Sequence, residues 1–205
     1  MNSVEKRAIL GVGGIFALRM IGLFMIVPVF SVYGDNYAHA TPFLIGLAVG
    51  IYGLGQAIFQ IPMSLAADKF PRKPIIFLGL ILFALGGIIA ANATDIYEVI
   101  IGRALAGSGA VSAVLMALLA DVTREEMRTK AMATMGLTIA TSIMLAFAFG
   151  PLLVGSLGIS GLFWLTAGFA VLAMLLLLFV PTPLRVLKHN LDNKSIGQQL
   201  ATVLK

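Results

Sequence analysis

Two arginines stand inside long apolar stretches of this sequence. Arg19 lies within residues 8–33, and Arg103 lies within residues 96–120. A charge at the centre of a bilayer costs from about 2.5 to more than 10 kcal/mol unless it faces protein or water. We therefore expect both arginines to face an internal polar cavity, where they would bind anions or acids. The alternative, a side chain that reaches back to the membrane surface, suits Arg103 better because it stands nearer a helix end.

Two glutamines lie on another apolar stretch, residues 43–66. Gln56 and Gln60 are four residues apart, so a helix places them on one face. Their amides can hydrogen-bond a small-molecule substrate or a neighbouring helix. The spacing leaves both interpretations open.

A short charged run between two apolar stretches forms a second candidate region. Asp68, Lys69, Arg72 and Lys73 fall within residues 62–74, which a proline bounds at either end. So many charges in so few residues cannot form a core. The run predicts a tight turn at a membrane surface.

The sequence holds none of the common catalytic or metal-binding patterns. It has no cysteine, which excludes disulfides, zinc–thiolate sites and iron–sulfur clusters. His39 and His189 are expected in loops on opposite sides of a membrane, and no HExxH or Walker run occurs. The run Gly107-Ser108-Gly109 lacks the glycine spacing of a nucleophile elbow and indicates helix packing. We expect no catalytic residue, metal site, cofactor or enzymatic activity.

The composition indicates a membrane protein. Of the 205 residues, 60% are hydrophobic and only 11% are charged, far from the balance of a soluble domain. Six apolar stretches reach the roughly 20 residues that a membrane-spanning helix needs. They are residues 8–33, 43–66, 74–92, 96–120, 131–155 and 161–180. The predicted fold is an all-α transmembrane six-helix bundle over residues 1–183.

The six predicted helices divide into two sets of three. Because each set has an odd number of crossings, the second set is inverted relative to the first. Arg19 precedes Gly22 in the first helix of one set, and Arg103 precedes Gly107 in the first helix of the other. This correspondence favours two inverted three-helix repeats.

Lysine and arginine divide between the two sides of the predicted bundle. The basic segments are the N-terminus, residues 67–73, residues 121–130 and the tail. The alternate loops, 34–42, 93–95 and 156–160, contain neither residue type. The positive-inside rule then predicts that both termini are cytoplasmic. The net charge of +5 is a topology signal on this interpretation, so we expect no nucleic-acid partner.

Residues 184–205 follow a Pro-Thr-Pro run that ends the last predicted helix. Leucine and isoleucine recur in this tail at near-helical intervals among polar and basic residues. The pattern fits either an amphipathic linker on the inner leaflet or a frayed tail, and it does not decide between them.

Several motifs, taken in order, resemble the major facilitator superfamily of transporters. The run Ser64–Lys73 resembles that family's signature A, Gly-x-x-x-Asp-Arg-x-Gly-Arg-Arg, which joins its second and third helices. The run Arg103–Gly107 resembles signature B, and Gly150-Pro151 resembles the antiporter signature C. Residues 121–131 resemble the family's loop between helices four and five. Over residues 8–185, the chain is similar to the YajR-like branch of drug:proton antiporters.

The resemblance implies roles for the charged turn. Asp68, Lys69, Arg72 and Lys73 would form a conformational latch that holds one access state. Arg72 would pair with Asp121, at the end of the fourth helix.

The resemblance also implies a fold and a path for solute. The chain would form the N-terminal half of a twelve-helix transporter, with a substrate cavity that includes Arg19, Gln56, Gln60 and Arg103. The residues that would allow close helix packing or kinks are Pro28, Gly107, Gly150 and Pro151.

The implied function is efflux of small amphipathic compounds, as in drug resistance, by proton antiport and alternating access across a bacterial inner membrane. Its partners would be membrane lipid, a small-molecule substrate, protons and a second six-helix half. We expect either a truncated piece of a transporter, inactive alone, or a half-transporter that forms a homodimer. Because no carboxylate lies deep in a predicted span, a uniporter or importer is an alternative. A non-transporting membrane interaction protein is another.

Overall fold

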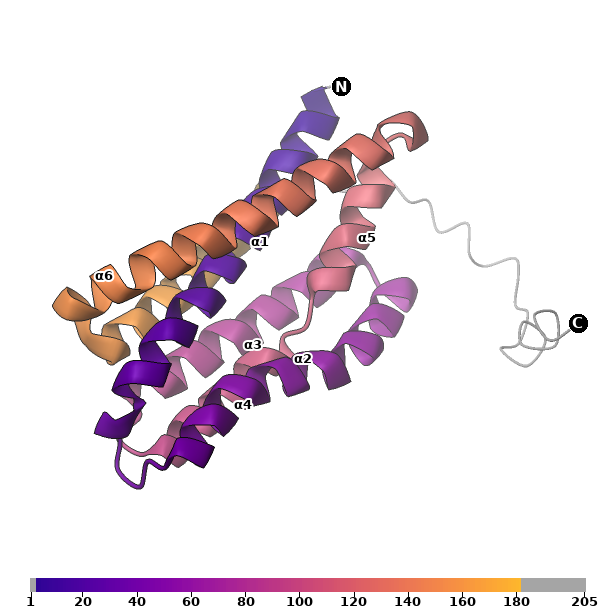
Figure 1. Ribbon diagram of the computed structural model, residues 1–205. Coiled ribbons are helices and arrows are strands. Elements are labelled where there is room, and N and C mark those ends of the chain that lie inside the picture. Colours follow the sequence, from indigo (N-terminus) through magenta and orange to yellow (C-terminus); the bar gives the residue numbers. More distant parts are fainter. Residues whose placement is uncertain (1–2, 182–205) are drawn as a thin grey trace, which may run out of the picture.

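The structure, a computed structural model, describes residues 3–181, which are helical almost throughout (Figure 1). The helices are α1 (Ser3–Tyr33), η1 (Gly34–Asn36), α2 (Pro42–Lys69), α3 (Arg72–Asn92), α4 (Ile96–Ser108), α5 (Ser112–Val122) and α6 (Glu125–Phe179). No β-strand occurs within these residues, so the prediction of an all-α fold is confirmed. The predicted tail, 184–205, lies outside the described part of the chain.

The helix labelled α6 consists of two arms that double back on each other. Its 55 residues would extend about 80 Å as one straight helix, more than twice the apolar thickness of a bilayer. The backbone instead reverses at Gly158, where φ is 68° and ψ is 177°, a conformation that only glycine adopts readily. The two arms, 125–157 and 159–179, therefore run in opposite directions (Figure 1). The arms contain the fifth predicted stretch and most of the sixth, and within residues 3–181 five helices, α6 among them, are long and apolar enough to cross a membrane.

The fourth crossing is interrupted, whereas the sequence predicted one continuous helix over residues 96–120. α4 ends at Ser108 and α5 begins at Ser112, with residues 109–111 between them. Glycine, which disfavours a helix interior, occurs on both sides of Ser108. A side chain at Gly79 of α3 would overlap this break, so α3 packs directly against it.

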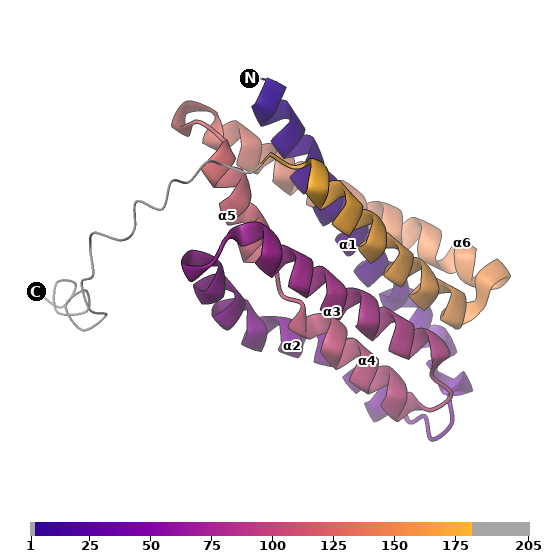
Figure 2. The ribbon, with the colours of Figure 1, turned by 180° about the vertical axis from the view of Figure 1, so that it is seen from behind.

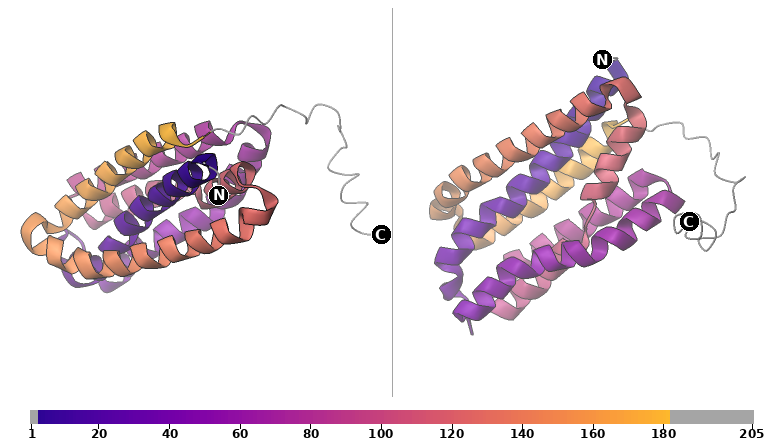
Figure 3. Two further views of the ribbon diagram at one scale, coloured as in Figure 1. Left: turned by 90° about the horizontal axis from the view of Figure 1, so that it is seen from above. Right: turned by 45° about the vertical axis from the view of Figure 1, so that its right-hand side comes forward.

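The helices form two groups that meet along the bundle (Figure 2). The first group is α1 with the two arms of α6, and the second group is α2, α3 and α4. α1 lies between the two arms of α6, since Gly13 faces Met135 of the first arm and Gly14 faces Leu176 of the second. α2 and α3 both pack against α4, and α3 also packs against α6. α5 leaves the second group and approaches α1, as the right-hand view of Figure 3 shows.

Apolar side chains pack into two large clusters, one toward each end of the bundle. Phe16 and Leu115 belong to the cluster around the start of α1, and Phe30 and Phe163 belong to the cluster around its end. A smaller cluster that includes Tyr52 lies between them, packed against the middle of α1. This middle layer is where polar side chains enter the bundle.

The end of the bundle without lysine or arginine is closed by contacts between two loops. Ala38 pairs with residues 94–96 through two backbone hydrogen bonds. Asp95 caps the start of α4, and its Oδ2 lies 2.7 Å from Nδ1 of His39. Hydrogen bonds from the Tyr97 amide and from His39 hold the pKa of Asp95 below its usual value. These contacts fix where α4 begins.

Glycine allows close packing where two helix backbones touch. A methyl group at Gly150, on the first arm of α6, would overlap the Met25 carbonyl of α1. Pro151 lies inside the first arm of α6, and the nonhelical φ and ψ in this helix belong to Gly158. Pro28 likewise lies inside α1.

We expect Gly150→Ala to lower the thermal stability of the chain, because relieving the overlap requires moving a whole helix. Overpacking of this kind costs about 1–3 kcal/mol. Gly155→Ala on the same arm is a matched control, since nothing lies within 4 Å of a methyl group there. Gly155→Ala should leave the thermal stability of the chain unchanged or slightly raise it, because alanine favours a helix more than glycine does. Thermal unfolding in detergent, followed by size-exclusion chromatography, measures both variants, and equal stability of the two would contradict this packing.

Candidate functional site

Arg19 is buried at the break in the fourth crossing. It is 2% exposed, and its guanidinium lies 5.3 Å from the ring centroid of Phe83. It donates to the Gly109 carbonyl at 3.0 Å, to Ser112 Oγ at 3.3 Å and to the Tyr52 hydroxyl at 3.4 Å. The Gly109 carbonyl lies just beyond the end of α4, and it accepts from Arg19 as well as from the Val111 amide at 3.0 Å. A cation at this position also opposes the negative end of the helix dipole.

Arg103 is buried against α2 and is 5% exposed. It donates from Nε to the Ala48 carbonyl at 3.1 Å and from a terminal nitrogen to the Val49 carbonyl at 3.4 Å. Its guanidinium lies 5.2 Å from the ring centroid of Tyr52, so Tyr52 contacts both arginines. Within residues 3–181, neither arginine forms an ion pair with a carboxylate.

Ser112 joins α2 to the same site. Its Oγ accepts hydrogen bonds from Arg19 and from Nε2 of Gln56, each at 3.3 Å. Gln60, four residues further along α2, is exposed. The structure therefore brings three of the four predicted cavity residues together and leaves Gln60 outside. We call the assembled group the polar cluster, which consists of Arg19, Tyr52, Gln56, Arg103 and Ser112.

Gly107 sets the distance between α4 and α2 at this level. A methyl group at Gly107 would overlap the Tyr52 carbonyl, so a larger residue would push α2 away. Gly107 thus lets Tyr52 lie close to Arg103.

An open hollow of about 410 Å³ lies between the end of α1 and the first turns of α2, toward the end without lysine or arginine. Val49 lines this hollow and also supplies a carbonyl to Arg103. The hollow therefore reaches the helix turn that holds the arginine. Its lining residues are Ser31, Asp35, Pro42, Ile45, Gly46 and Val49.

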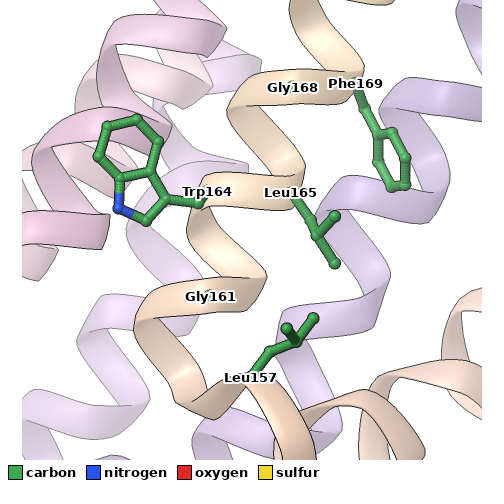
Figure 4. A pocket seen from close by; sticks show the side chains of 6 residues that line it. All are labelled: Leu157, Gly161, Trp164, Leu165, Gly168 and Phe169. Atoms are coloured by element: carbon green, nitrogen blue, oxygen red, sulfur yellow. The ribbon is translucent and has the colours of Figure 1, made fainter.

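A second hollow, of about 430 Å³, lies on α6, along the second arm and the last residue of the first (Figure 4). Trp164 points to one side of the helix, and Leu165 and Phe169 point to the other. No charged side chain lines it, so it suits a lipid chain better than a polar solute. Its lining residues are Leu157, Gly161, Trp164, Leu165, Gly168 and Phe169.

The charged turn after α2 lies at the opposite end of the bundle from His39. Arg72 donates from Nε to Asp121 Oδ2 at 2.6 Å, which is the pair that the family resemblance implied. Asp68 lies 3.9 Å from another nitrogen of the same guanidinium. Arg72 therefore links the end of α2 to the end of α5.

Pro71 stands where the turn enters α3. Its φ of −55° and ψ of 136° are ordinary for proline, so the residue caps the helix without strain. Lys69 is exposed and Lys73 is half-buried. Neither lysine forms an ion pair in the part of the chain that the structure describes.

A second ion pair at this end was not predicted from the sequence. Glu5 is 3% exposed and accepts a hydrogen bond from Arg124 Nε at 2.8 Å. The bond to this carboxylate raises the pKa of Arg124. With the Arg72–Asp121 pair, it ties the α5–α6 turn to both α1 and α3. The sequence did offer a signal for this ion pair, because Glu5 is the one acid among the basic residues of the N-terminus.

Tyr52 and Ser112 were also missed. Tyr52 precedes Gln56 by four residues, so the helix face that carries the glutamines could have been extended to it. Ser112 offered no comparable signal, because its position depends on the break between α4 and α5.

Comparison with known proteins agrees with this architecture. The Major Facilitator Superfamily model matches residues 12–205. The chain is 47% identical over 180 residues to the inner membrane transport protein YajR of Escherichia coli K12, covering 88% of this chain and 40% of YajR. It is 31% identical over 149 residues to the class H tetracycline resistance protein of Pasteurella multocida, covering 70% of this chain and 36% of that protein.

A solved structure shares the fold. The human organic anion transporter MFSD10 (TETRAN) superposes with a TM-score of 0.69 at 21% identity, over 89% of this chain and 49% of MFSD10. The chain spans half or less of each of these three proteins. The helical bundle, the intramembrane arginines and the family match lead to one assignment. The chain belongs to the Major Facilitator Superfamily of membrane transporters.

Proposed function

We propose that this chain is the N-terminal half of a secondary transporter that exports small amphipathic compounds by proton antiport. Transport would proceed by alternating access across the inner membrane of a bacterium. The polar cluster would contribute to the solute path, and the charged turn with Asp121 would act as a conformational latch.

The polar cluster carries this proposal. Arg19 and Arg103 lie in an otherwise apolar bundle, with backbone carbonyls and Tyr52 as partners. Intramembrane charges are costly and mark solute or ion pathways in transporters. The cluster draws on α1 and α2 from one three-helix set and on α4 and α5 from the other. Transporter sites commonly form between such repeats, near the bilayer midplane.

The relatives support export as the direction of transport. One of them is named for tetracycline resistance, a phenotype that removal of the compound from the cell would produce. The YajR relative is named as an inner membrane transport protein, which supports the proposed location.

Proton coupling must use acids that lie away from the polar cluster or in another half. Asp68 and Asp121 are the acids that contact Arg72, and both stand at helix ends. Protonation of either would weaken its attraction to Arg72. This offers a physical route by which a proton could open the latch.

A second six-helix half is supported by the outward surfaces. α2 and the first arm of α6 present large apolar side chains to the outside, and Gly46, Gly50 and Gly53 of α2 have open space around them. The exposed apolar residues include Leu54, Ile58, Ile61, Leu65, Leu137, Met144 and Leu152. A facing half would cover these helices and close the solute path.

The distribution of charge supports a cytoplasmic position for both termini. The Glu5–Arg124 and Arg72–Asp121 pairs lie at one end of the bundle, where the lysines and arginines of the loops gather. The other end carries His39 and Asp95 and lacks lysine and arginine. This asymmetry matches the positive-inside rule.

A uniporter or importer is the second candidate function. The observation that favours it is the absence of an ion pair between a carboxylate and either intramembrane arginine within residues 3–181. Without an acid in the solute path, transport would follow the solute gradient alone.

Antiport predicts that extrusion of a fluorescent amphipathic dye stops when a protonophore collapses the proton gradient. The assay uses proteoliposomes that contain this chain with a C-terminal half of the E. coli relative. Addition of the protonophore to protein-free liposomes controls for its effect on the dye. Extrusion at an unchanged rate without the gradient would reject antiport and favour the uniporter.

A requirement for a second half predicts that this chain alone shows no dye flux in liposomes and that the added C-terminal half restores it. The reason is that the exposed faces of α2 and α6 leave the solute path open to lipid. Flux from the chain alone, with a dimer on native mass spectrometry, would instead support a homodimeric transporter.

The latch predicts that Arg72→Asp lowers flux by roughly tenfold, the scale of a 1–3 kcal/mol shift between two conformations. Exchanging the charges in Arg72→Asp/Asp121→Arg should restore much of the loss, because the ion pair is re-formed. Arg128→Asp, at an exposed arginine of the same end, is the matched control. Failure of the exchanged pair to recover any flux would count against a latch between these residues.

A further inference from the structure

We infer that the break between α4 and α5 is a binding site for the carboxylate of a small organic anion. Arg19, Ser112 and Gln56 would hold the carboxylate, with the first amides of α5 beside it. This inference rests on the proposed transport function and names the class of solute that the path accepts.

The charge at the break is the first observation. Arg19 is almost fully buried, and its ring neighbour Phe83 and the Gly109 carbonyl are neutral. Arg103 adds a second cation on the other side of Tyr52. A desolvated pair of cations without a carboxylate partner in the described chain attracts an anion far more strongly than it would in water.

The balance of hydrogen-bond donors and acceptors is the second observation. Nε of Arg19 is buried and has no acceptor in the described part of the chain. Ser112 Oγ already accepts from both Arg19 and Gln56, which uses both of its lone pairs and leaves its own proton to donate. The site therefore offers unused donors and lacks acceptors. A carboxylate, which only accepts hydrogen bonds, supplies what is missing.

The start of α5 also favours an anion at this site. This helix has 11 residues, and its first hydrogen bond runs from the Leu115 amide to the Val111 carbonyl. The amides before Leu115 have no acceptor within the helix, and the positive end of the helix dipole lies at Ser112. An anion beside Ser112 would meet these amides and the Arg19 guanidinium together.

The packing around the donors is apolar, which favours an amphipathic anion. Tyr52 and Phe83 pack edge to face, with ring centroids 6.3 Å apart, next to the guanidinium of Arg19. Gln56 and Ser112 are only half-buried, so a solute can reach the donors from their side. An aromatic carboxylate places its charge on the donors and its ring against apolar side chains.

The test measures equilibrium binding of radiolabelled benzoate to the purified chain in nanodiscs, without any ion gradient. Benzamide, a neutral molecule of nearly the same shape, is the competitor that isolates charge. We expect saturable benzoate binding that excess benzamide does not displace. We expect Arg19→Gln to weaken benzoate binding by roughly 30-fold or more, as when one partner of a buried charged contact is removed.

Arg128→Gln is the matched control, because it removes one arginine from an exposed position and should leave benzoate affinity unchanged. Ser112→Ala retains the buried cation and removes one donor, so it tests the site even if Arg19→Gln fails to fold. We expect it to weaken binding by roughly tenfold, the scale of a hydrogen bond to a charged group.

Three results would each overturn the inference. They are no benzoate binding to the folded chain, equal binding of benzoate and benzamide, and unchanged benzoate affinity in Ser112→Ala. In any of these cases Arg19 only caps the end of α4. Because binding is measured without a gradient, loss of proton-driven flux with intact benzoate binding would reject antiport and leave the anion site standing.

Discussion

A cation in the middle of an apolar bundle must find partners there, and in this chain the backbone provides most of them. Arg103 uses carbonyls of α2, and Arg19 uses the Gly109 carbonyl exposed by the break after α4. The break and the arginine are coupled, because the Gly109 carbonyl, which would bond within a continuous helix, here accepts from both the Val111 amide and Arg19. Close approach of α2, α3 and α4 at glycines brings these groups within reach.

The large-scale architecture followed from simple sequence properties. Length and hydropathy predicted the apolar helices, because in lipid a helix satisfies the backbone hydrogen bonds within a single segment. The distribution of lysine and arginine separated the loops into two kinds, and the structure gathers them at opposite ends of the bundle. The partnership of Arg72 with Asp121 followed from family resemblance rather than from spacing, since 49 residues separate them.

The finer features of the site were beyond such reasoning. The run of small residues around Ser108 predicted close packing, but whether the helix would pass through it depended on α3 and Arg19, which lie elsewhere in the sequence. Ser112 gained its position only through that interruption. Glu5 and Arg124 are 119 residues apart, and their pairing required knowledge of which helices are neighbours. Tyr52 was missed although it had a local signal, because it shares a helix face with Gln56.

The short helix α5 has a mechanical consequence. At one end Ser112 touches Arg19, and at the other Asp121 touches Arg72. Its 11 residues form a rod about 16 Å long, too short to bend appreciably. Residues 109–111 and the turn after Val122 separate this rod from the helices before and after it. A tilt of the rod in a transport cycle would therefore displace its contact in the membrane interior and its contact at the surface together.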